Sequence, residues 1–260
     1  MTEVHLHESQ ASSLPRVKPT PKASNIPGTF FYSPSDDGTD ENLLILLHGL
    51  GDTHVPFSKL GKSLKLPQTA VLSLRAPQQV PFLYEDAWQW YPSFDTLGEM
   101  IPNPNPTPAL QFLTKVVDHL TTHCKWPLNR IHLFGFAQGG SVAVEFTLER
   151  WKVSRASSGT TTPDSQAFAS VVSVAGPLLT YPTLSTKCPT PLLIVHRSSG
   201  ETSIPSKDIN AFKKGFENIT EHKMKGPKEG MPASREDWEP IMKFWSERLE
   251  RRKVEGLYDI

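Results

Sequence analysis

Apolar residues in this chain come in short uninterrupted runs, and stretches with a helical repeat lie between them. Runs without alternation are typical of strands buried on both faces of a parallel sheet. Such strands alternating with amphipathic helices predict the α/β class, with a mainly parallel central sheet and helices on both faces. The predicted strands are residues 29–32, 42–48, 69–74, 130–134, 168–174, 191–196 and 219–224, and the predicted helices are residues 56–64, 109–123, 140–150, 206–217 and 236–252.

Other segments lack this periodicity. Residues 1–28 are rich in Pro, Ser and Lys and are predicted to form a disordered arm, which leaves residues 29–252 as the folded domain and residues 253–260 as a tail. The low-complexity stretch at residues 152–166 predicts a mobile surface insertion. Residues 76–108 are rich in Pro and aromatic residues. A loop of this length is uncommon unless it serves as a lid or a binding loop.

Composition and charge exclude some classes of protein but do not indicate one function. The 27 basic and 27 acidic residues give a formal net charge of zero, so the whole molecule has no attraction for nucleic acid or an anionic membrane. No apolar run reaches the ~20 residues of a membrane span, and we expect no integral membrane association. The N-terminus lacks the apolar core of a secretory signal, and Cys124 and Cys188 cannot form a disulfide framework. These features predict a cytoplasmic or nuclear location.

The segment Gly135-Phe136-Ala137-Gln138-Gly139 is the most informative part of the chain. It joins a predicted strand to a predicted helix, as the G-x-S-x-G turn of serine hydrolases does. Glycines let the chain reverse where a Cβ would collide with neighbouring backbone. The central residue of such a turn stands above the sheet, where a serine attacks carbonyl carbon. Here Ala137 takes that place, so the nucleophile is missing.

Several motifs together resemble the acyl-protein thioesterase/carboxylesterase (phospholipase/carboxylesterase) family of α/β-hydrolases. They are LHGLGDT at residues 47–53, RAP at 75–77, the loop at 87–95 and GFAQGG at 135–140. The likeness runs from about Phe30 to Leu249, and its first half is the more specific. The resemblance implies an α/β-hydrolase fold and a serine–histidine–acid triad.

This chain departs from the family pattern at all three triad positions. Beside Ala137 in the elbow, Glu201 is the only carboxylate in the stretch that matches the acid loop, residues 196–205. Ala233 stands at the histidine position of the motif before the last helix. An engineered Ser→Ala change would explain Ala137 alone, whereas Ala233 and the altered acid loop favour a natural pseudo-hydrolase.

The chemistry of the triad explains the weight of these changes. A serine hydroxyl needs an imidazole to take its proton, and the imidazole needs a carboxylate to fix its tautomer. Losing one member costs several orders of magnitude in rate. Two replacements remain open: Ser141, one helical turn after the elbow, as a nucleophile, and His222, on a predicted strand, as a displaced base. The competing interpretation of Ser141 is that it packs inside the core. The competing interpretation of His222 is that it is a half-exposed strand residue without a catalytic role.

Parts of the binding site are expected to survive these changes. The oxyanion hole of this fold uses backbone N–H groups, here those of Leu50 and Gln138. Trp88 and Trp90 are expected either to line an apolar pocket or to roof the core. His54 is a candidate ligand contact at the mouth of the first glycine loop. His48 is expected either to line the pocket or to hydrogen-bond backbone.

The sequence therefore predicts an α/β-hydrolase domain with two competing functions. The first is a catalytically inactive or impaired esterase/thioesterase-like protein that binds an acyl or other small apolar ligand, or a protein partner. The alternative is a genuine carboxylesterase or thioesterase, with an unorthodox site or as an inactivated mutant. No cluster of His, Cys or Asp has metal-ligand spacing, so neither a metal nor a cofactor is predicted. The pattern indicates no particular oligomeric state.

Overall fold

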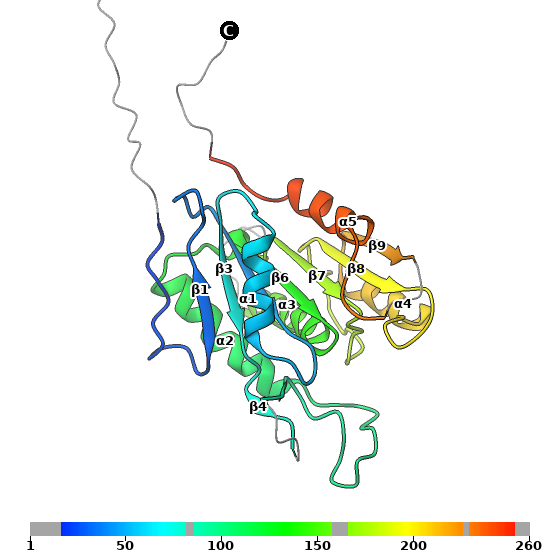
Figure 1. Cartoon of the computed structure of the whole chain (residues 1–260). Coiled ribbons are helices and arrows are strands. Elements are labelled where there is room, and N and C mark those ends of the chain that lie inside the picture. Colours follow the sequence, from blue (N-terminus) through cyan, green and yellow to red (C-terminus); the bar gives the residue numbers. More distant parts are fainter. Residues whose placement is uncertain (1–16, 82–85, 158–165, 226–228, 253–260) are drawn as a thin grey trace, which may run out of the picture.

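A seven-stranded sheet forms the centre of the molecule, in the strand order β1-β3-β2-β6-β7-β8-β9 (Figure 1). The computed structural model describes residues 17–81, 86–157, 166–225 and 229–252. Strand β1 pairs with β3 in the antiparallel sense, and the other neighbours in the sheet are parallel. The strands of this sheet are β1 (Phe30–Ser33), β2 (Asn42–Leu47), β3 (Thr69–Leu74), β6 (Ile131–Phe136), β7 (Ser170–Val174), β8 (Leu192–Arg197) and β9 (Ile219–Met224).

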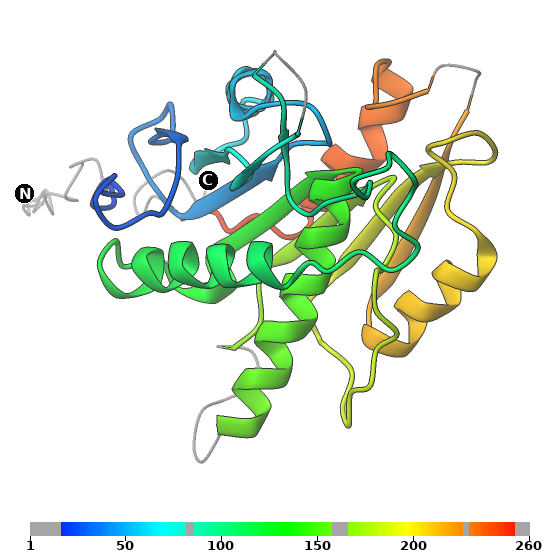
Figure 2. The ribbon, with the colours of Figure 1, turned by 90° about the horizontal axis from the view of Figure 1, so that it is seen from below.

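Helices cover both faces of this sheet (Figures 1 and 2). Side chains of α1 and α5 lie in one buried apolar cluster, and those of α2, α3 and α4 lie in the other. The helices are α1 (His54–Ser63), α2 (Thr107–Thr122), α3 (Gln138–Ser157), α4 (Ser206–Gly215) and α5 (Arg235–Ser246), with a short 3₁₀ turn η1 (Leu128–Arg130). The predicted mainly parallel sheet with helices on both faces is confirmed.

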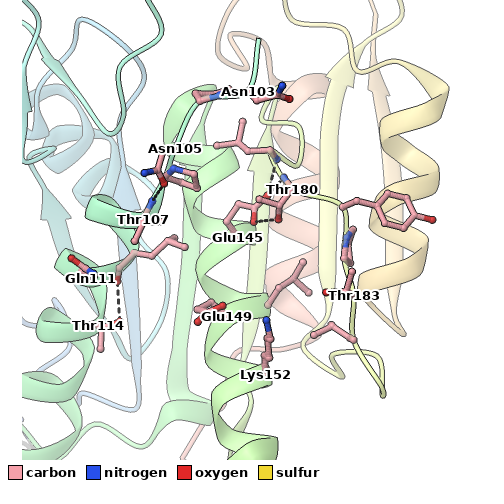
Figure 3. A pocket seen from close by; sticks show the side chains of 18 residues that line it. Asn103, Asn105, Thr107, Gln111, Thr114, Glu145, Glu149, Lys152, Thr180 and Thr183 are labelled. Atoms are coloured by element: carbon pink, nitrogen blue, oxygen red, sulfur yellow. Dashed lines mark hydrogen bonds between the residues drawn. The ribbon is translucent and has the colours of Figure 1, made fainter. Parts of the chain in front are cut away.

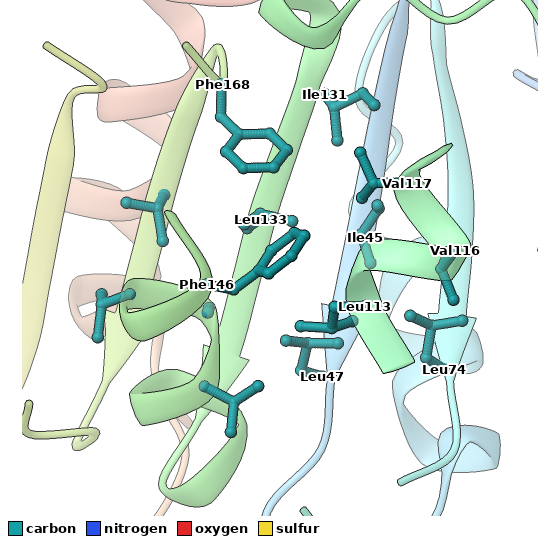
Figure 4. Close-up of a cluster of buried hydrophobic side chains, with 14 of the residues drawn as sticks. Ile45, Leu47, Leu74, Leu113, Val116, Val117, Ile131, Leu133, Phe146 and Phe168 are labelled. Atoms are coloured by element: carbon teal, nitrogen blue, oxygen red, sulfur yellow. The ribbon is translucent and has the colours of Figure 1, made fainter. Parts of the chain in front are cut away.

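Strand β2 shows why its sequence is apolar without alternation. Leu43, Ile45 and Leu47 belong to the cluster beneath α2 and α3, part of which is drawn in Figure 4. Leu44 and Leu46 belong to the opposite cluster, beneath α1 and α5. Successive side chains of a strand point to opposite faces, so a strand between two helix layers must be apolar at every position.

The predicted disordered arm extends too far toward the domain. The structure places residues 17–28 against α2 and the loop before β2, and only residues 1–16 lie outside the described residues. The Lys18 N–H donates to Asp40 over 2.8 Å, and the Lys22 N–H donates to Nε2 of His119 over 3.2 Å. Ile26 is 3% exposed and belongs to the core. One buried side chain and these bonds hold a segment whose composition suggests disorder.

Two predicted boundaries are also wrong. Helix α3 continues to Ser157, so residues 152–157 of the mobile insertion predicted at residues 152–166 are helical, and residues 158–165 lie outside the described part. Helix α5 ends at Ser246 instead of at residue 252. Leu249 lies after the helix and still packs against the apolar cluster. Its apolar side chain therefore extended the helical repeat in the sequence beyond the true end of the helix. The predicted C-terminal tail, residues 253–260, lies outside the described residues as well.

The long loop predicted at residues 76–108 contains a small two-stranded sheet. Strands β4 (Gln78–Gln79) and β5 (Trp88–Gln89) pair in the antiparallel sense. Residues 82–85 between them are outside the described part. Among the described residues, no helix is long and apolar enough to cross a membrane.

Candidate functional site

The elbow has the geometry that a nucleophile turn requires. Ala137 follows the last residue of β6 and precedes the first residue of α3, and its φ is +48°. This left-handed conformation is uncommon for a residue with a Cβ. The Ala137 N–H donates to the Val174 carbonyl over 2.8 Å, and the Ala137 carbonyl accepts from the Ser141 N–H over 3.0 Å. Neighbouring backbone therefore holds the turn, and Ala137 stays partly exposed.

Two glycines of the elbow are required by close backbone contacts. A Cβ on Gly135 would lie 2.1 Å from the Gly139 carbonyl oxygen. A Cβ on Gly139 would lie 2.3 Å from the carbonyl oxygen of Leu47, at the end of β2. Real Cβ atoms do not approach backbone so closely, so both positions admit only glycine. The same contacts show that the elbow lies directly against the first glycine loop.

The two predicted oxyanion donors remain available in this arrangement. Leu50 is in the glycine loop and is 39% exposed, whereas Gln138 begins α3. Among the described residues, neither backbone N–H has a hydrogen-bond acceptor. A helix N-terminus also carries partial positive charge, which favours an anionic or strongly polar oxygen. The backbone at this place can thus bind a carbonyl or carboxylate oxygen.

The Gln138 side chain has a role that sequence reasoning missed. Its Oε1 accepts from the Trp90 N–H over 2.9 Å, and its Nε2 donates to the Tyr91 carbonyl over 3.0 Å and to Ser93 Oγ over 2.7 Å. Gln138 is buried, with 6% of its surface exposed. It therefore holds the loop after β5 against the elbow.

His48 and Trp90 lie inside the core. Of the two alternatives predicted for each side chain, the one that lines a surface pocket is therefore wrong. Both are 0% exposed. His48 Nε2 accepts from the Ala76 N–H over 2.9 Å, and Nδ1 donates to the Gly49 carbonyl over 2.7 Å. Burial lowers the pKa of His48. Trp90 Nε1 donates to the His48 carbonyl over 2.8 Å. The interpretations of His48 as a backbone partner and of Trp90 as a roof of the core agree with these contacts.

His54 and Trp88 lie at a more open place beside the glycine loop. The Gly51 N–H donates to the Trp88 carbonyl over 2.9 Å, which ties β5 to this loop. The Arg75 guanidinium stacks over the Trp88 ring, 3.7 Å from its centroid. His54 begins α1, and its pKa is lowered by burial and, to a lesser extent, by Arg75. Both residues are half-buried, so they remain candidates for ligand contact.

The loop at the acid position is held together by a residue that the sequence did not indicate. Glu201 is exposed. Glu229, from the segment after β9, accepts from the Thr202 N–H over 3.1 Å and from the Thr202 hydroxyl. Its Oε1 occupies the space where a Cβ on Gly200 would lie, at 1.8 Å. The Glu229 carboxylate thus holds this loop, and Glu201 has no comparable hydrogen bond to any of the described residues.

The backbone at the predicted base position, Ala233, takes part in the start of helix α5. Ala233 is exposed, and its N–H donates to Asp237 Oδ2 over 3.2 Å just before α5 begins. Asp237 is 8% exposed and lies 3.8 Å from the Arg197 guanidinium. The segment between β9 and α5 holds no histidine anywhere in its sequence, residues 225–234. An imidazole from this loop is therefore absent whatever its conformation.

The two replacement residues are placed as their competing interpretations expected. Ser141 is 0% exposed and lies in the first turns of α3. His222 is half-buried on β9, opposite Val195 of β8. Burial lowers the pKa of His222, and Asp237 raises it. Within the described part of the chain, no group of His, Cys, Asp and Glu is arranged to hold a metal ion.

Residues 33–237 match the phospholipase/carboxylesterase family. The chain belongs to that family. It is 38% identical over 226 residues to the uncharacterized hydrolase UM10204 of Mycosarcoma maydis, covering 86% of this chain and 82% of the relative. It is 33% identical over 115 residues to the uncharacterized hydrolase C9G1.08c of Schizosaccharomyces pombe, covering 42% of this chain and 47% of that one.

Solved structures share this fold at low sequence identity. Acyl-protein thioesterase 2 of Zea mays superposes with a TM-score of 0.63 at 19% identity, covering 86% of this chain and 100% of that one. Esterase PE8 superposes with a TM-score of 0.68 at 18% identity, covering 85% and 98%. The predicted family and α/β-hydrolase fold are confirmed. The predicted loss of the triad is a matter for experiment.

Proposed function

We propose that this family member has no esterase or thioesterase turnover and acts by binding an acyl or other small apolar ligand, or a protein partner. The observation that carries the proposal is Ala137 at φ +48°. The turn that exposes a nucleophile is present, and the residue at its apex has no nucleophilic atom. The absence of any histidine from residues 225–234 supports the same conclusion, because a serine at the apex would still lack a base.

The first experiment tests for the lost chemistry. Purified protein should hydrolyse p-nitrophenyl acyl esters and acyl thioesters no faster than buffer, and a fluorophosphonate probe should not label it. Ser141→Ala is the matched control, because Ser141 is the serine nearest the elbow in the helix. Labelling of the native chain that Ser141→Ala abolishes would restore the hydrolase alternative.

Restoring the triad in steps tests the assignment of its positions. Ala137→Ser alone should not give a proficient hydrolase, since the serine has no imidazole to take its proton. Adding Ala233→His should raise the rate more than the first change did, because nucleophile and base act as a unit. High activity from Ala137→Ser alone would place the base elsewhere, with His222 the first residue to test.

The retained function is tested by ligand binding. The free N–H groups of Leu50 and Gln138 and the half-buried Trp88 support an acyl site over Ala137. Dodecanoate at 100 times its Kd should stabilise the fold by about 2.7 kcal/mol, which in a domain of this size raises Tm by roughly 5–11 °C. Trp88→Ala should remove the shift. Tyr181→Ala, which truncates an aromatic ring that is 68% exposed, should leave it intact. If neither variant nor native protein responds to dodecanoate, the partner-binding function is favoured.

A further inference from the structure

An exposed hairpin carries an unusual share of apolar surface. Residues 93–101, called here the apolar hairpin, project beyond the carboxyl ends of the strands (Figure 1). Phe94 is 50% exposed, Leu97 84% and Met100 75%, and these are three of the eight exposed large apolar side chains among the described residues. Scattered exposed apolar residues are ordinary, but a group of them on one projection marks an interaction site.

The apolar hairpin has a defined shape. Phe94 and Met100 face each other in an antiparallel bridge, and the Ile101 N–H donates to the Ser93 carbonyl over 2.9 Å. Asp95 Oδ1 accepts from the N–H groups of Leu97 and Glu99, each over 2.9 Å. The carboxylate of Asp95 thus fixes the turn. An ordered projection loses little conformational entropy when it binds.

The charged residues of the chain segment that carries the hairpin have one sign. Between Arg75 and Lys115 the sequence holds four acidic residues, including Asp95 and Glu99, and no Lys, Arg or His. An anionic membrane would repel such a segment. A partner surface should instead combine apolar contacts with basic residues.

The chain carries a surface of that kind on another element. A groove runs along α3 beside residues 179–186 and has two hollows, which share Lys152 and Leu184. The larger, of about 600 Å³, is drawn in Figure 3, and the smaller has a volume of about 310 Å³. The smaller hollow is called here the basic groove. Its lining includes the buried Trp151 and the cations of Lys152 and Arg155. Glu149 is the exposed carboxylate next to them, whereas the carboxylate of Glu145 is buried and bonded to residues 179–180.

Within one chain, the apolar hairpin and the basic groove do not meet. Gln138 at the start of α3 bonds Ser93 at the base of the hairpin. Lys152 lies 14 residues further along α3, which is roughly 20 Å at 1.5 Å per residue. The residues that line the basic groove include none from the hairpin, and Leu97 is 84% exposed. In this conformation, contact between the two surfaces therefore needs a second molecule.

We propose that the apolar hairpin of one copy of this chain docks into the basic groove of a second copy. Leu97 and Met100 would cover the Trp151 and Leu184 surface, and Glu99 would face Lys152 and Arg155. The net charge of zero leaves no overall repulsion between copies. Because the two surfaces differ, the contact is head-to-tail and builds a ring or a short chain. This contact does not depend on the ligand site over Ala137.

Sedimentation velocity of the full chain measures the association directly. The native protein should form dimers and larger species as its concentration rises, and high salt should weaken them because the charge contact is exposed. The pair Leu97→Ser and Met100→Ser should leave a monomer. Val17→Ser, which changes an apolar side chain that is 50% exposed elsewhere, should associate like the native protein.

A charge exchange tests which surfaces meet. Glu99→Lys and Lys152→Glu should each weaken self-association by about tenfold at low salt, since an attraction becomes a repulsion. When the two variants are mixed, every hairpin finds a complementary groove in the other variant. The mixture should therefore associate like the native protein.

Three outcomes would overturn the proposal. The native chain could stay monomeric at every concentration, the single charge variants could associate like the native protein, or their mixture could stay dissociated. Phosphatidylcholine vesicles provide a separate check. Flotation of the native monomer with these vesicles, lost in the Leu97→Ser and Met100→Ser variant, would show that the hairpin binds lipid instead of a second copy.

Discussion

Replacing Gln138 by leucine removes the side-chain bonds that join the elbow to the loop after β5. Leucine has similar bulk but neither donates nor accepts, so the Trp90 N–H and the Tyr91 carbonyl lose their partners. Trp90 is 0% exposed and Tyr91 6%, so water cannot readily replace the lost bonds. Each unsatisfied buried backbone group costs about 1–3 kcal/mol. With two such groups, we expect Gln138→Leu to lower the free energy of unfolding by roughly 2–6 kcal/mol.

Guanidinium unfolding followed by tryptophan fluorescence measures this change. In a domain of this size, a loss of about 3 kcal/mol lowers Tm by roughly 6–12 °C. Hydrogen exchange at the Trp90 amide should accelerate as well, since its acceptor is gone. Gln111→Leu is the matched control, because Gln111 is exposed on α2. A loss of less than about 0.5 kcal/mol, comparable to an ordinary surface change, would refute the reasoning.

Three further predictions follow from backbone contacts and buried groups. Gly139→Ala should destabilise the domain severely or prevent folding, because its Cβ would lie 2.3 Å from the Leu47 carbonyl oxygen, whereas Gly51→Ala, at φ +79° with open space around it, should cost only about 1 kcal/mol in urea unfolding. Burial lowers the pKa of His132 to about 3, so the unfolded chain takes up a proton at higher pH than the folded one, and stability should fall as pH drops below about 6.5, by up to about 1.4 kcal/mol per pH unit. His132→Gln should flatten that dependence in denaturant titrations at several pH values, and the exposed His123→Gln should not. Glu229→Ala should speed hydrogen exchange at the Thr202 amide, and unchanged exchange there would show that the carboxylate does not hold the acid loop.

The fold was predictable because its signals are local and repeated. Strand β2 is apolar at successive positions from Leu43 to Leu47, which only a strand between two helix layers requires. The arm was misjudged for the opposite reason. Its composition is polar, and its order depends on Ile26 entering the core and on Lys22 meeting His119, which is 97 residues away. A single distant contact leaves no periodic pattern in the sequence.

In the candidate site too, features with a local signal were predicted and features that depend on distant contacts were not. The elbow was recognised from its glycines. These are required because backbone atoms within the motif and at the end of β2 leave no room for a Cβ. Glu229 was not recognised, because its partner Thr202 is 27 residues away and is brought near only by the crossover from β8 to β9. For Trp90, a pocket wall and a roof over the core both stayed open, because aromatic residues in a Pro-rich loop carry no signal of which ring turns inward. Its burial depends on the Gln138 side chain, 48 residues later.

These contacts also explain how an elbow can persist without its serine. Gly135 and Gly139 are fixed by backbone approaches of 2.1 and 2.3 Å, and Gln138 by its bonds to the loop after β5. None of these contacts involves the side chain at position 137. The left-handed conformation of Ala137 costs about 1–2 kcal/mol, and the bonds to Val174 and Ser141 hold it in place. The conformation of the motif around Ala137 is therefore held by contacts that need no serine, and its presence is not by itself evidence of catalysis. Catalysis must be judged from the apex residue and from the predicted base position, where this chain has Ala137 and Ala233.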